Sequence, residues 1–259
     1  MDLFILILIG AIGLILGSFA TVCIYRLPNN LSIVKPRSFC TYCQKTINWF
    51  YNIPLFSYFF LKGRSNCCNK KISITYPLTE FLYLFTIIFL YFSFEDIHTE
   101  FIFTTFFIFS LIILFFTDLK FFFLPNIVIL FLYFLGLLRF FFINENSFFV
   151  LPAEGFIGAT LGIGFLYGIA KFYKIVRKKE GMGMGDIKLI GALGLWLGWK
   201  GIIFIIIISS SLGVIIGISG IFFKKMNLQS SLPYGCFLII ASIGYMFCGS
   251  YSDLFYSFF

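Results

Sequence analysis

Long apolar stretches, separated by shorter polar ones, most constrain the fold of this 259-residue chain. Of its residues 60% are hydrophobic and 12% are charged, whereas soluble domains carry about 25% charged residues. A water-soluble core could not bury so many apolar side chains, so we expect a lipid bilayer to surround most of the chain. Eight apolar stretches are candidate membrane spans, at residues 3–25, 77–94, 101–117, 124–143, 154–173, 187–199, 201–223 and 232–249.

The length of these stretches favours helices, because every backbone N–H and C=O group must be hydrogen-bonded inside a bilayer. The predicted fold class is an all-α, polytopic transmembrane helix bundle of about eight spans. The sixth stretch is short and glycine-rich, and it can tilt or merge with the seventh. We expect three parts: a first transmembrane helix over 1–25, a cytoplasmic cysteine-containing segment over 26–76, and a transmembrane core over 77–259.

Lysine and arginine are distributed unevenly between the two predicted sides of the membrane. With both termini outside, eight spans place seventeen of the nineteen basic residues on the cytoplasmic side, as the positive-inside rule requires; Arg139 and Lys200 fall elsewhere. The net charge of +8 is thus explained by topology and by attraction to anionic lipid, and we expect no nucleic-acid partner. The same topology places Asp118 and Asp186 on one side, the cytoplasmic one.

Two aspartates stand at the ends of apolar stretches. Asp118 ends the third stretch in Phe-Thr-Asp-Leu-Lys, and Asp186 follows a glycine-rich run, Gly-Met-Gly-Met-Gly, that begins at Gly181. Ionisable groups are costly in a membrane and usually have a function there. Two structural alternatives stay open: Asp118 can be an interface residue beside the lipid head groups, and Asp186 can be the N-cap of a helix.

A pair of aspartates on facing helices can hydrolyse a peptide bond without a metal, a serine or a cysteine. Like charges at short range keep one carboxyl protonated while the other is ionised. The ionised group can take a proton from water, and the protonated group can hydrogen-bond the scissile carbonyl. The alternating glycines, Gly183 and Gly185 among them, allow a close backbone approach, so we expect them to bind an extended substrate.

Other residues near these motifs have more than one interpretation. Lys188 can orient Asp186 or anchor the end of its helix. Glu80, near the start of the second span, is interpreted as a structural partner for a lysine or arginine. The aspartates also suit a proton or cation relay in a transporter or channel, because intramembrane acids serve that function by the same physics.

Six sequence blocks occur in order along most of the chain: GSFATVCIYRLP from Gly17, PRSFCTYC from Pro36, WFYNIPLFSY from Trp49, YPLTE from Tyr76, Asp118-Leu119 with Leu124-Pro125, and GMGDIKL from Gly183. Together these blocks resemble those of the type IV prepilin peptidases of the GxGD aspartyl-protease group. Six blocks in one order are far more specific than a single GxGD motif. Ala20-Thr21 and Asn126 depart from the family's usual Leu-Asn and Asp.

The resemblance implies that Asp118 and Asp186 are the catalytic pair. It implies a multi-pass enzyme of the bacterial inner membrane that cuts prepilins or pseudopilins, on the cytoplasmic side, after the glycine of a short basic leader. Many members also methylate the new N-terminal amine with S-adenosyl-L-methionine. A peptidase-only member is an alternative, which the retained segment 26–76 disfavours.

The polar segment contains Cys40-x-x-Cys43, a common spacing for half of a zinc site. The family's second half reads GxCxxC, whereas this chain has GRSNCC from Gly63, with Ser65 in the first cysteine's place. We expect a structural zinc, not needed for proteolysis, on Cys40, Cys43, Cys68 and Cys67. A three-thiolate site, or none, stays open because adjacent cysteines rarely bind one metal together. Cys236, in the last predicted span, is interpreted as an apolar packing residue.

Overall fold

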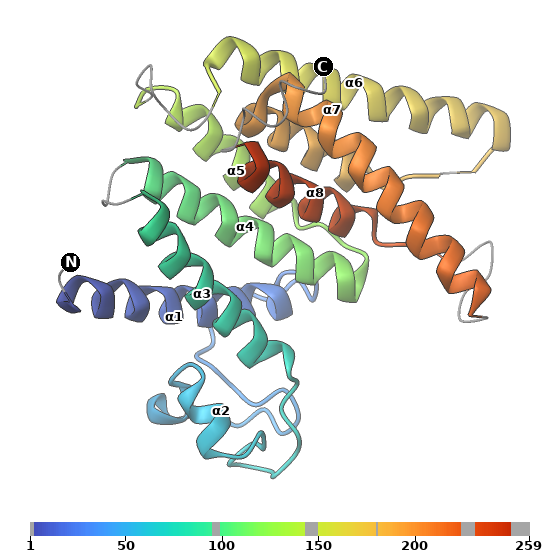
Figure 1. The fold of residues 1–259 in the computed structure, drawn as a ribbon. Helices are drawn as coiled ribbons and strands as arrows, with labels where there is room; N and C mark the ends of the chain where they lie inside the picture. Colours follow the sequence, from blue (N-terminus) through green and yellow to red (C-terminus); the bar gives the residue numbers. More distant parts are fainter. Residues whose placement is uncertain (1–2, 95–98, 143–149, 180, 224–230, 250–259) are drawn as a thin grey trace. The chain divides into compact units, whose positions relative to one another are not determined.

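The chain is helical in a computed structural model, which describes residues 3–94, 99–142, 150–179, 181–223 and 231–249 (Figure 1). Within these ranges two isolated β-bridges form, and no strand does. The helices are α1 Leu3–Arg26, the 3-10 helix η1 Trp49–Asn52, α2 Phe56–Phe60, α3 Thr75–Phe94, α4 Thr99–Phe121, α5 Asn126–Arg139, α6 Pro152–Arg177, α7 Met184–Phe222 and α8 Tyr234–Gly249.

Among the described residues, α1, α3, α4, α6 and α7 are long and apolar enough to cross a membrane, and α5 and α8 are shorter apolar helices. Large apolar side chains are exposed along them, for example Phe172 on α6 (70%) and Ile218 on α7 (64%). The prediction of an all-α, multi-pass membrane protein is therefore confirmed. The count of eight spans and their orientation stay predictions, and Lys224 and Lys225, which contribute to the predicted cytoplasmic charge, lie outside the described residues.

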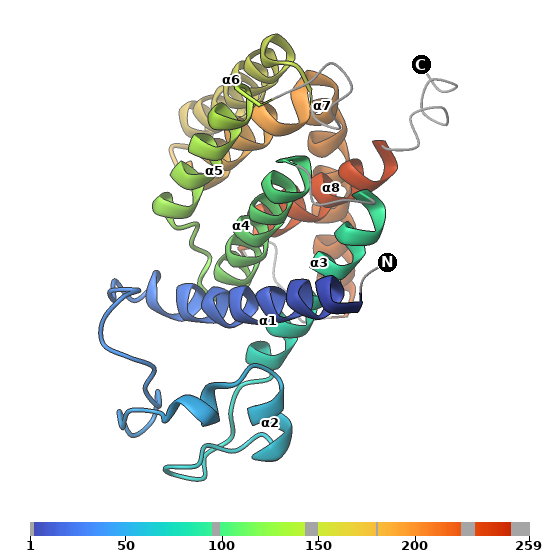
Figure 2. The ribbon, with the colours of Figure 1, turned by 90° about the vertical axis from the view of Figure 1, so that its left-hand side faces the viewer.

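Internal contacts divide the chain into two units, Met1–Ile113 and Leu114–Phe259. In the first unit α1 lies against α3 (Figure 2). Gly17 allows the two backbones to approach closely, because a Cβ atom there would lie 2.9 Å from the Cα atom of Glu80. The three parts predicted from the sequence, with boundaries after residues 25 and 76, differ from these two units and stay predictions.

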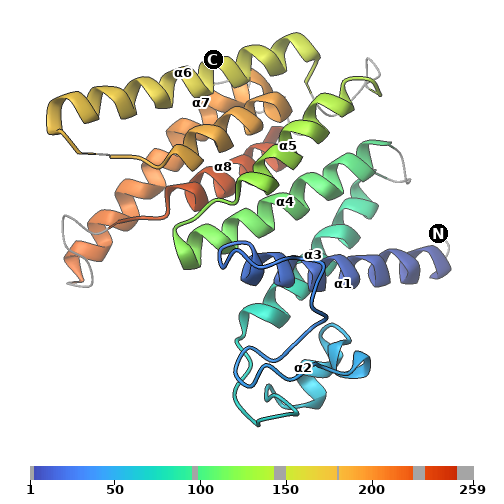
Figure 3. The same cartoon turned by 180° about the vertical axis from the view of Figure 1, so that it is seen from behind.

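In the second unit α6 lies along α7 (Figure 3). Glycines again set the separation of the helices: a Cβ atom at Gly155 would lie 2.8 Å from the Leu195 carbonyl oxygen, and one at Gly158 would lie 2.8 Å from the Trp199 nitrogen. This close packing joins α6 to the part of α7 around residues 195–199.

The helix α7 is interrupted at Gly198, whose φ of 70° and ψ of −176° are accessible in practice to glycine alone. Twelve residues of straight helix would separate Ile190 and Ile202 by about 18 Å. Their side chains instead lie 3.3 and 3.4 Å from one point, the Cβ position of Gly162. The sixth and seventh predicted stretches therefore form two helical segments of α7 that meet in a sharp bend at Gly198.

Arg139, the last residue of α5, satisfies the carbonyl groups that this interruption leaves without helical partners. Its guanidinium donates hydrogen bonds to the carbonyl oxygens of Leu195 (3.2 Å), Trp196 (3.3 Å) and Val150 (3.1 Å). The guanidinium carbon lies 5.1 Å from the centroid of the Trp196 ring, and the side chain is 2% exposed. This buried position explains why Arg139 departs from the predicted distribution of positive charge.

Candidate active site

Asp118 lies near the end of α4, and its carboxylate faces the first turn of α8. The Cys236 backbone N–H donates a hydrogen bond to Asp118 Oδ2 at 2.9 Å, and the Gly235 N–H is directed to the same carboxylate. Such first-turn N–H groups have no partner within their own helix and lie at the positive end of its dipole. They stabilise a negative charge on Asp118, which is 5% exposed.

Two further contacts fix the first turn of α8. The hydroxyls of Tyr234 and Ser209, on α8 and α7, share a hydrogen bond at 3.0 Å. The Cys236 thiol donates to the Phe115 carbonyl of α4 at 3.3 Å. The N–H donors that face Asp118 are therefore held by α4 and α7 together.

Asp186, in the first turn of α7, lies in the neighbourhood of the Asp118 carboxylate. The Leu124 side chain links the two neighbourhoods, because its Cβ atom lies 3.1 Å from the Cβ position of Gly185 and its Cδ1 atom lies 3.1 Å from that of Gly235. Gly185 directly precedes Asp186, and Gly235 lies beside the Asp118 carboxylate. The charge of Asp118 acts on Asp186, and the charges of both carboxyl groups act on Cys236. The structure thus brings the two aspartates together, and their catalytic role stays a prediction.

The N-cap of α7 is Gly183, so the interpretation of Asp186 as an N-cap is wrong. Gly183 has an extended backbone (φ −71°, ψ 141°), and its carbonyl accepts a hydrogen bond from the Asp186 N–H at 3.2 Å. Asp186 is the third helical residue, where the helix dipole also favours an acid. Gly183 is exposed and extended, whereas Gly185 is already helical and leaves room for Leu124.

Lys188 joins α7 to α5. Its Nζ atom donates a hydrogen bond to Asn126 Oδ1 at 3.0 Å, and the Tyr133 hydroxyl donates to the Lys188 carbonyl at 3.0 Å. Asn126, which departs from the family's usual Asp, opens α5 and provides the acceptor. These contacts favour an anchoring role for Lys188 over direct contact with Asp186.

Gly235 and the Cys236 backbone are part of the site, and sequence reasoning missed them. The available signal was Leu-Pro-Tyr-Gly at the start of the last apolar stretch, which is typical of a helix N-terminus. The pattern contains nothing that pairs it with Asp118, 118 residues earlier in the chain. Cys236 is buried as expected, but its backbone N–H has this additional role.

The predicted metal ligands lie in the first unit, in two loops of the same form. The Cys40 N–H donates to the carbonyl of Lys45 at 2.9 Å, and the Ser65 N–H donates to that of Lys70 at 2.8 Å. An isolated antiparallel bridge closes each loop. Ser65 therefore has the structural position of Cys40, as the sequence block predicted.

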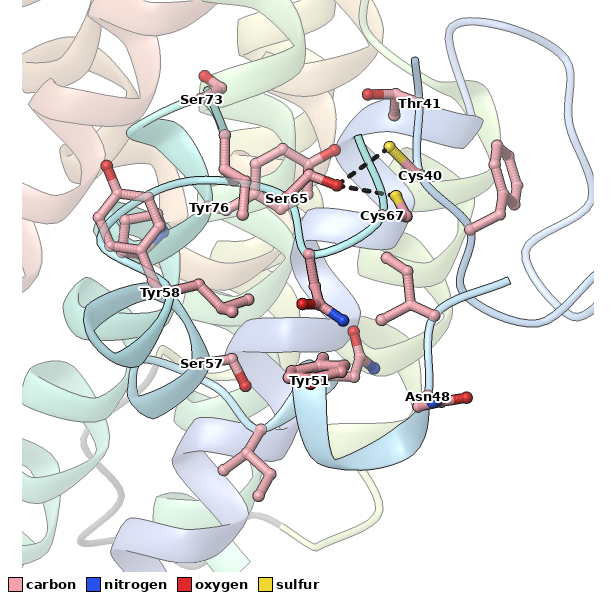
Figure 4. A pocket seen from close by; sticks show the side chains of 18 of the residues that line it. Cys40, Thr41, Asn48, Tyr51, Ser57, Tyr58, Ser65, Cys67, Ser73 and Tyr76 are labelled. Atoms are coloured by element: carbon pink, nitrogen blue, oxygen red, sulfur yellow. Dashed lines mark hydrogen bonds between the residues drawn. The ribbon is translucent and has the colours of Figure 1, made fainter. Parts of the chain in front are cut away.

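Cys67 adds a fourth thiol to the cluster in spite of this serine. The sulfur atoms of Cys40, Cys43, Cys67 and Cys68 all lie within 4.8 Å of one another, at 3.1 Å for Cys43–Cys67 and 3.7 Å for Cys40–Cys68. A tetrahedral zinc about 2.3 Å from each sulfur requires sulfur–sulfur distances of about 3.8 Å, so the four thiols fit this ion. The Ser65 hydroxyl lies 2.9 Å from Cys67 Sγ, beside the cluster (Figure 4).

The thiols of this cluster differ in how readily they ionise. Burial disfavours the Cys40 thiolate, but hydrogen bonds, first from Ser65, outweigh burial and lower the pKa of Cys40 to about 6. The Lys45 backbone favours the Cys43 thiolate, but the other thiols, first Cys67, outweigh it and raise the pKa of Cys43 to about 11. A bound cation would allow all of them to ionise.

Two family descriptions match the chain in succession: the bacterial peptidase A24 N-terminal domain over residues 11–94, and the type IV leader peptidase family over residues 105–218. The prepilin leader peptidase/N-methyltransferase of Pectobacterium carotovorum subsp. carotovorum is 30% identical over 91% of this chain and 90% of its own. This chain belongs to the type IV leader peptidase family. The resemblance seen in the six blocks is thereby confirmed.

Other members of the leader peptidase family are similar along their length. Proteins of the same name from Aeromonas hydrophila and Legionella pneumophila are each 31% identical, over 90% and 95% of this chain and 87% and 92% of theirs. No solved structure matches the chain with statistical significance.

Gly235→Ala should slow turnover, because the added Cβ would lie 2.9 Å from Asp118 Oδ2 and 3.1 Å from Leu124 Cδ1. We expect kcat/KM to fall by about a hundredfold, as small misplacements of reacting groups do. Gly244→Ala is the matched control, on the same helix with nothing within 4 Å of its Cβ position. The readout is cleavage of a prepilin, the substrate named for the relatives, by detergent-purified variants with equal melting temperatures. Equal rates for the two variants would contradict the placement of Gly235.

Cys67→Ser should weaken zinc binding, because it removes one of the four clustered thiols. We expect at least about a tenfold loss of affinity, measured by competition with a chelator and by metal analysis. Ser65→Ala should retain one zinc per chain, and Ser65→Cys combined with Cys67→Ser should restore binding. Loss of zinc in Ser65→Ala with retention in Cys67→Ser would show that the hydroxyl, not the displaced thiol, completes the site.

Proposed function

We propose that this chain is a membrane aspartyl endopeptidase that removes the leader of type IV prepilins or pseudopilins, cutting after the glycine. The observation that carries the proposal is the convergence of Asp118 and Asp186 beside the first turn of α8. It occurs in a chain that is 30% identical to a prepilin leader peptidase/N-methyltransferase over nine-tenths of both proteins. The positive-inside topology supports an active site on the cytoplasmic face of the bacterial inner membrane.

The two aspartates have different roles in this proposal. Asp118, faced by backbone N–H groups of α8, holds the negative charge and takes a proton from the attacking water. Asp186 holds the shared proton and donates a hydrogen bond to the scissile carbonyl. The water oxygen bonds to the carbonyl carbon, the carbon–nitrogen bond then breaks, and the departing amine receives a proton. No metal takes part in this chemistry.

The approach to α7 supports the binding of an extended substrate. Gly183 is exposed and extended, and it directly precedes the helical turn that carries Asp186. A substrate backbone at membrane depth must find partners for its own N–H and C=O groups. We infer that the extended backbone at Gly183 supplies them, while Gly185 and Lys188 hold the turn in place.

The names of the relatives support a second activity, N-methylation of the new N-terminal residue with S-adenosyl-L-methionine. In this transfer the amine lone pair forms a bond to the methyl carbon as the carbon–sulfur bond breaks, and the nitrogen loses a proton. A zinc held by Cys40, Cys43, Cys67 and Cys68 would stabilise the loops of the first unit and leave proteolysis unaffected.

Two alternatives are less well supported. A peptidase-only enzyme is disfavoured because the chain retains the N-terminal domain with its four clustered thiols. A proton-coupled transporter is disfavoured by membership of the leader peptidase family. The partners proposed are therefore prepilin-like precursors and the lipid bilayer, and we propose no nucleic-acid partner.

Asp118→Asn and Asp186→Asn should each lower prepilin cleavage by at least about a hundredfold, because each removes one half of the acid–base pair. The measurement is the intact mass of a prepilin incubated with detergent-purified enzyme, with and without S-adenosyl-L-methionine. It reports cleavage, the position of the cut and methylation in one experiment.

Glu154→Gln, which removes a charge from the start of α6, is the control and should cleave normally. Melting temperatures of the Asn variants close to wild type would show that folding is intact. A fully active single Asn variant would refute catalysis by Asp118 and Asp186 as a pair. Wild-type protein that cleaves no leader-bearing substrate would favour the alternative of a proton-coupled transporter.

A further inference from the structure

The first unit contains a cavity of about 250 Å³ between the cysteine loops, the segment that holds η1 and α2, and the start of α3. Figure 4 shows the ring of Tyr76 and the side chain of Ser65 on its walls, with Tyr51 and Tyr58 further round. Tyr42 also contributes to the lining, but its ring already faces the Lys70 ammonium, whose Nζ atom lies 5.0 Å from the ring centroid. Tyr51, Tyr58 and Tyr76 place aromatic rings in the lining, and an aromatic ring attracts a cation that lies over its face.

The charge of the cavity is opposite to that of its surroundings. Segment 26–76 carries eight lysines and arginines and no acidic residue. None of those basic residues is among the lining residues, which include one carboxylate, that of Glu80, and the thiols of Cys40 and Cys67 from the cluster. A cavity in a basic segment therefore presents a carboxylate to its occupant, which disfavours phosphates and other anions and favours a cation.

Glu80 is 8% exposed, and the donors that the described residues supply to it are neutral. Its Oε2 atom accepts a hydrogen bond from the Leu55 backbone N–H at 2.8 Å, and the Ser18 hydroxyl also contributes. The structure thus supplies neutral donors where a lysine or arginine partner was predicted. A buried carboxylate without a cationic partner is costly, and a bound cation would reduce that cost.

We propose that this cavity binds an organic cation, a sulfonium or ammonium group held by Glu80 and the surrounding tyrosine rings. The proposal rests on the proposed N-methyltransferase activity, in which two such cations take part. One is the sulfonium of S-adenosyl-L-methionine, and the other is the N-terminal ammonium of the cleaved substrate. Both share the chemistry that the cavity recognises, and binding experiments can distinguish them.

The test compares charged and neutral forms of each ligand on the full-length protein in detergent, by calorimetric titration. S-adenosyl-L-methionine is paired with S-adenosylhomocysteine, whose sulfur is uncharged. A peptide with a free N-terminal phenylalanine is paired with its N-acetylated form. We expect wild-type protein to bind one charged form about tenfold more tightly than its neutral counterpart.

Glu80→Gln isolates the charge, because the amide oxygen can still accept the Leu55 hydrogen bond. It should reduce the preference for the charged ligand to about twofold or less. Glu154→Gln, in the second unit, is the charge-matched control and should leave the preference unchanged. Tyr76→Leu should also reduce the preference, whereas Tyr76→Phe, which retains the ring, should not.

Loss of the preference for S-adenosyl-L-methionine in Glu80→Gln would assign the cavity to the methyl donor. Loss of the preference for the free-amine peptide in Glu80→Gln would assign the cavity to the N-terminus of the cleaved substrate. Equal binding of the charged and neutral forms by wild type, or an unchanged preference in Glu80→Gln, would overturn the proposal.

The cleavage and methylation assays keep this proposal separate from the proposed function. Suppose that Glu80→Gln methylates at the wild-type rate and keeps its ligand preference. That result would refute cation binding in the cavity and leave the two proposed enzyme activities unaffected. Charge-selective binding in a protein that cleaves and does not methylate would support the cavity and refute the second activity.

Discussion

A polar group without a hydrogen-bond partner is costly in apolar surroundings, and the second unit is arranged around this constraint. Where α7 is interrupted at Gly198, the guanidinium of Arg139 binds the carbonyl groups at the end of the first helical segment. Where α8 begins, its first-turn N–H groups are directed to the carboxylate of Asp118. One requirement thus explains both a structural contact and the position of a candidate catalytic residue.

The same contact makes the two aspartates unequal. Asp118 faces the N-terminus of a helix, whereas Asp186 lies in the first turn of its own helix after an extended glycine. Two identical side chains can then carry different protonation states, as an acid–base pair requires. The first unit contains different groups: a thiol cluster that fits a zinc ion, and a cavity with one carboxylate and several tyrosines in its lining.

Much of this could be predicted from the sequence, because membrane helices and family motifs are local patterns. The apolar stretches predicted the helices, and the glycine-rich block identified Asp186. The role of Gly235 could not be predicted, because it depends on a contact with Asp118 across 118 residues. The place of Cys67 in the cluster was doubtful in the sequence for a similar reason: adjacent cysteines suggest poor geometry until the loop that turns both sulfurs inward is known.

The central claim is that Asp118 and Asp186 act as one pair, and a double-mutant cycle tests it most directly. Single-turnover cleavage of a prepilin is measured for wild type, Asp118→Asn, Asp186→Asn and the variant with both substitutions. For residues that act as a unit, the double variant should be no more than about threefold slower than the slower single variant. Losses that multiply in the double variant would show that the two aspartates act independently and would contradict the account.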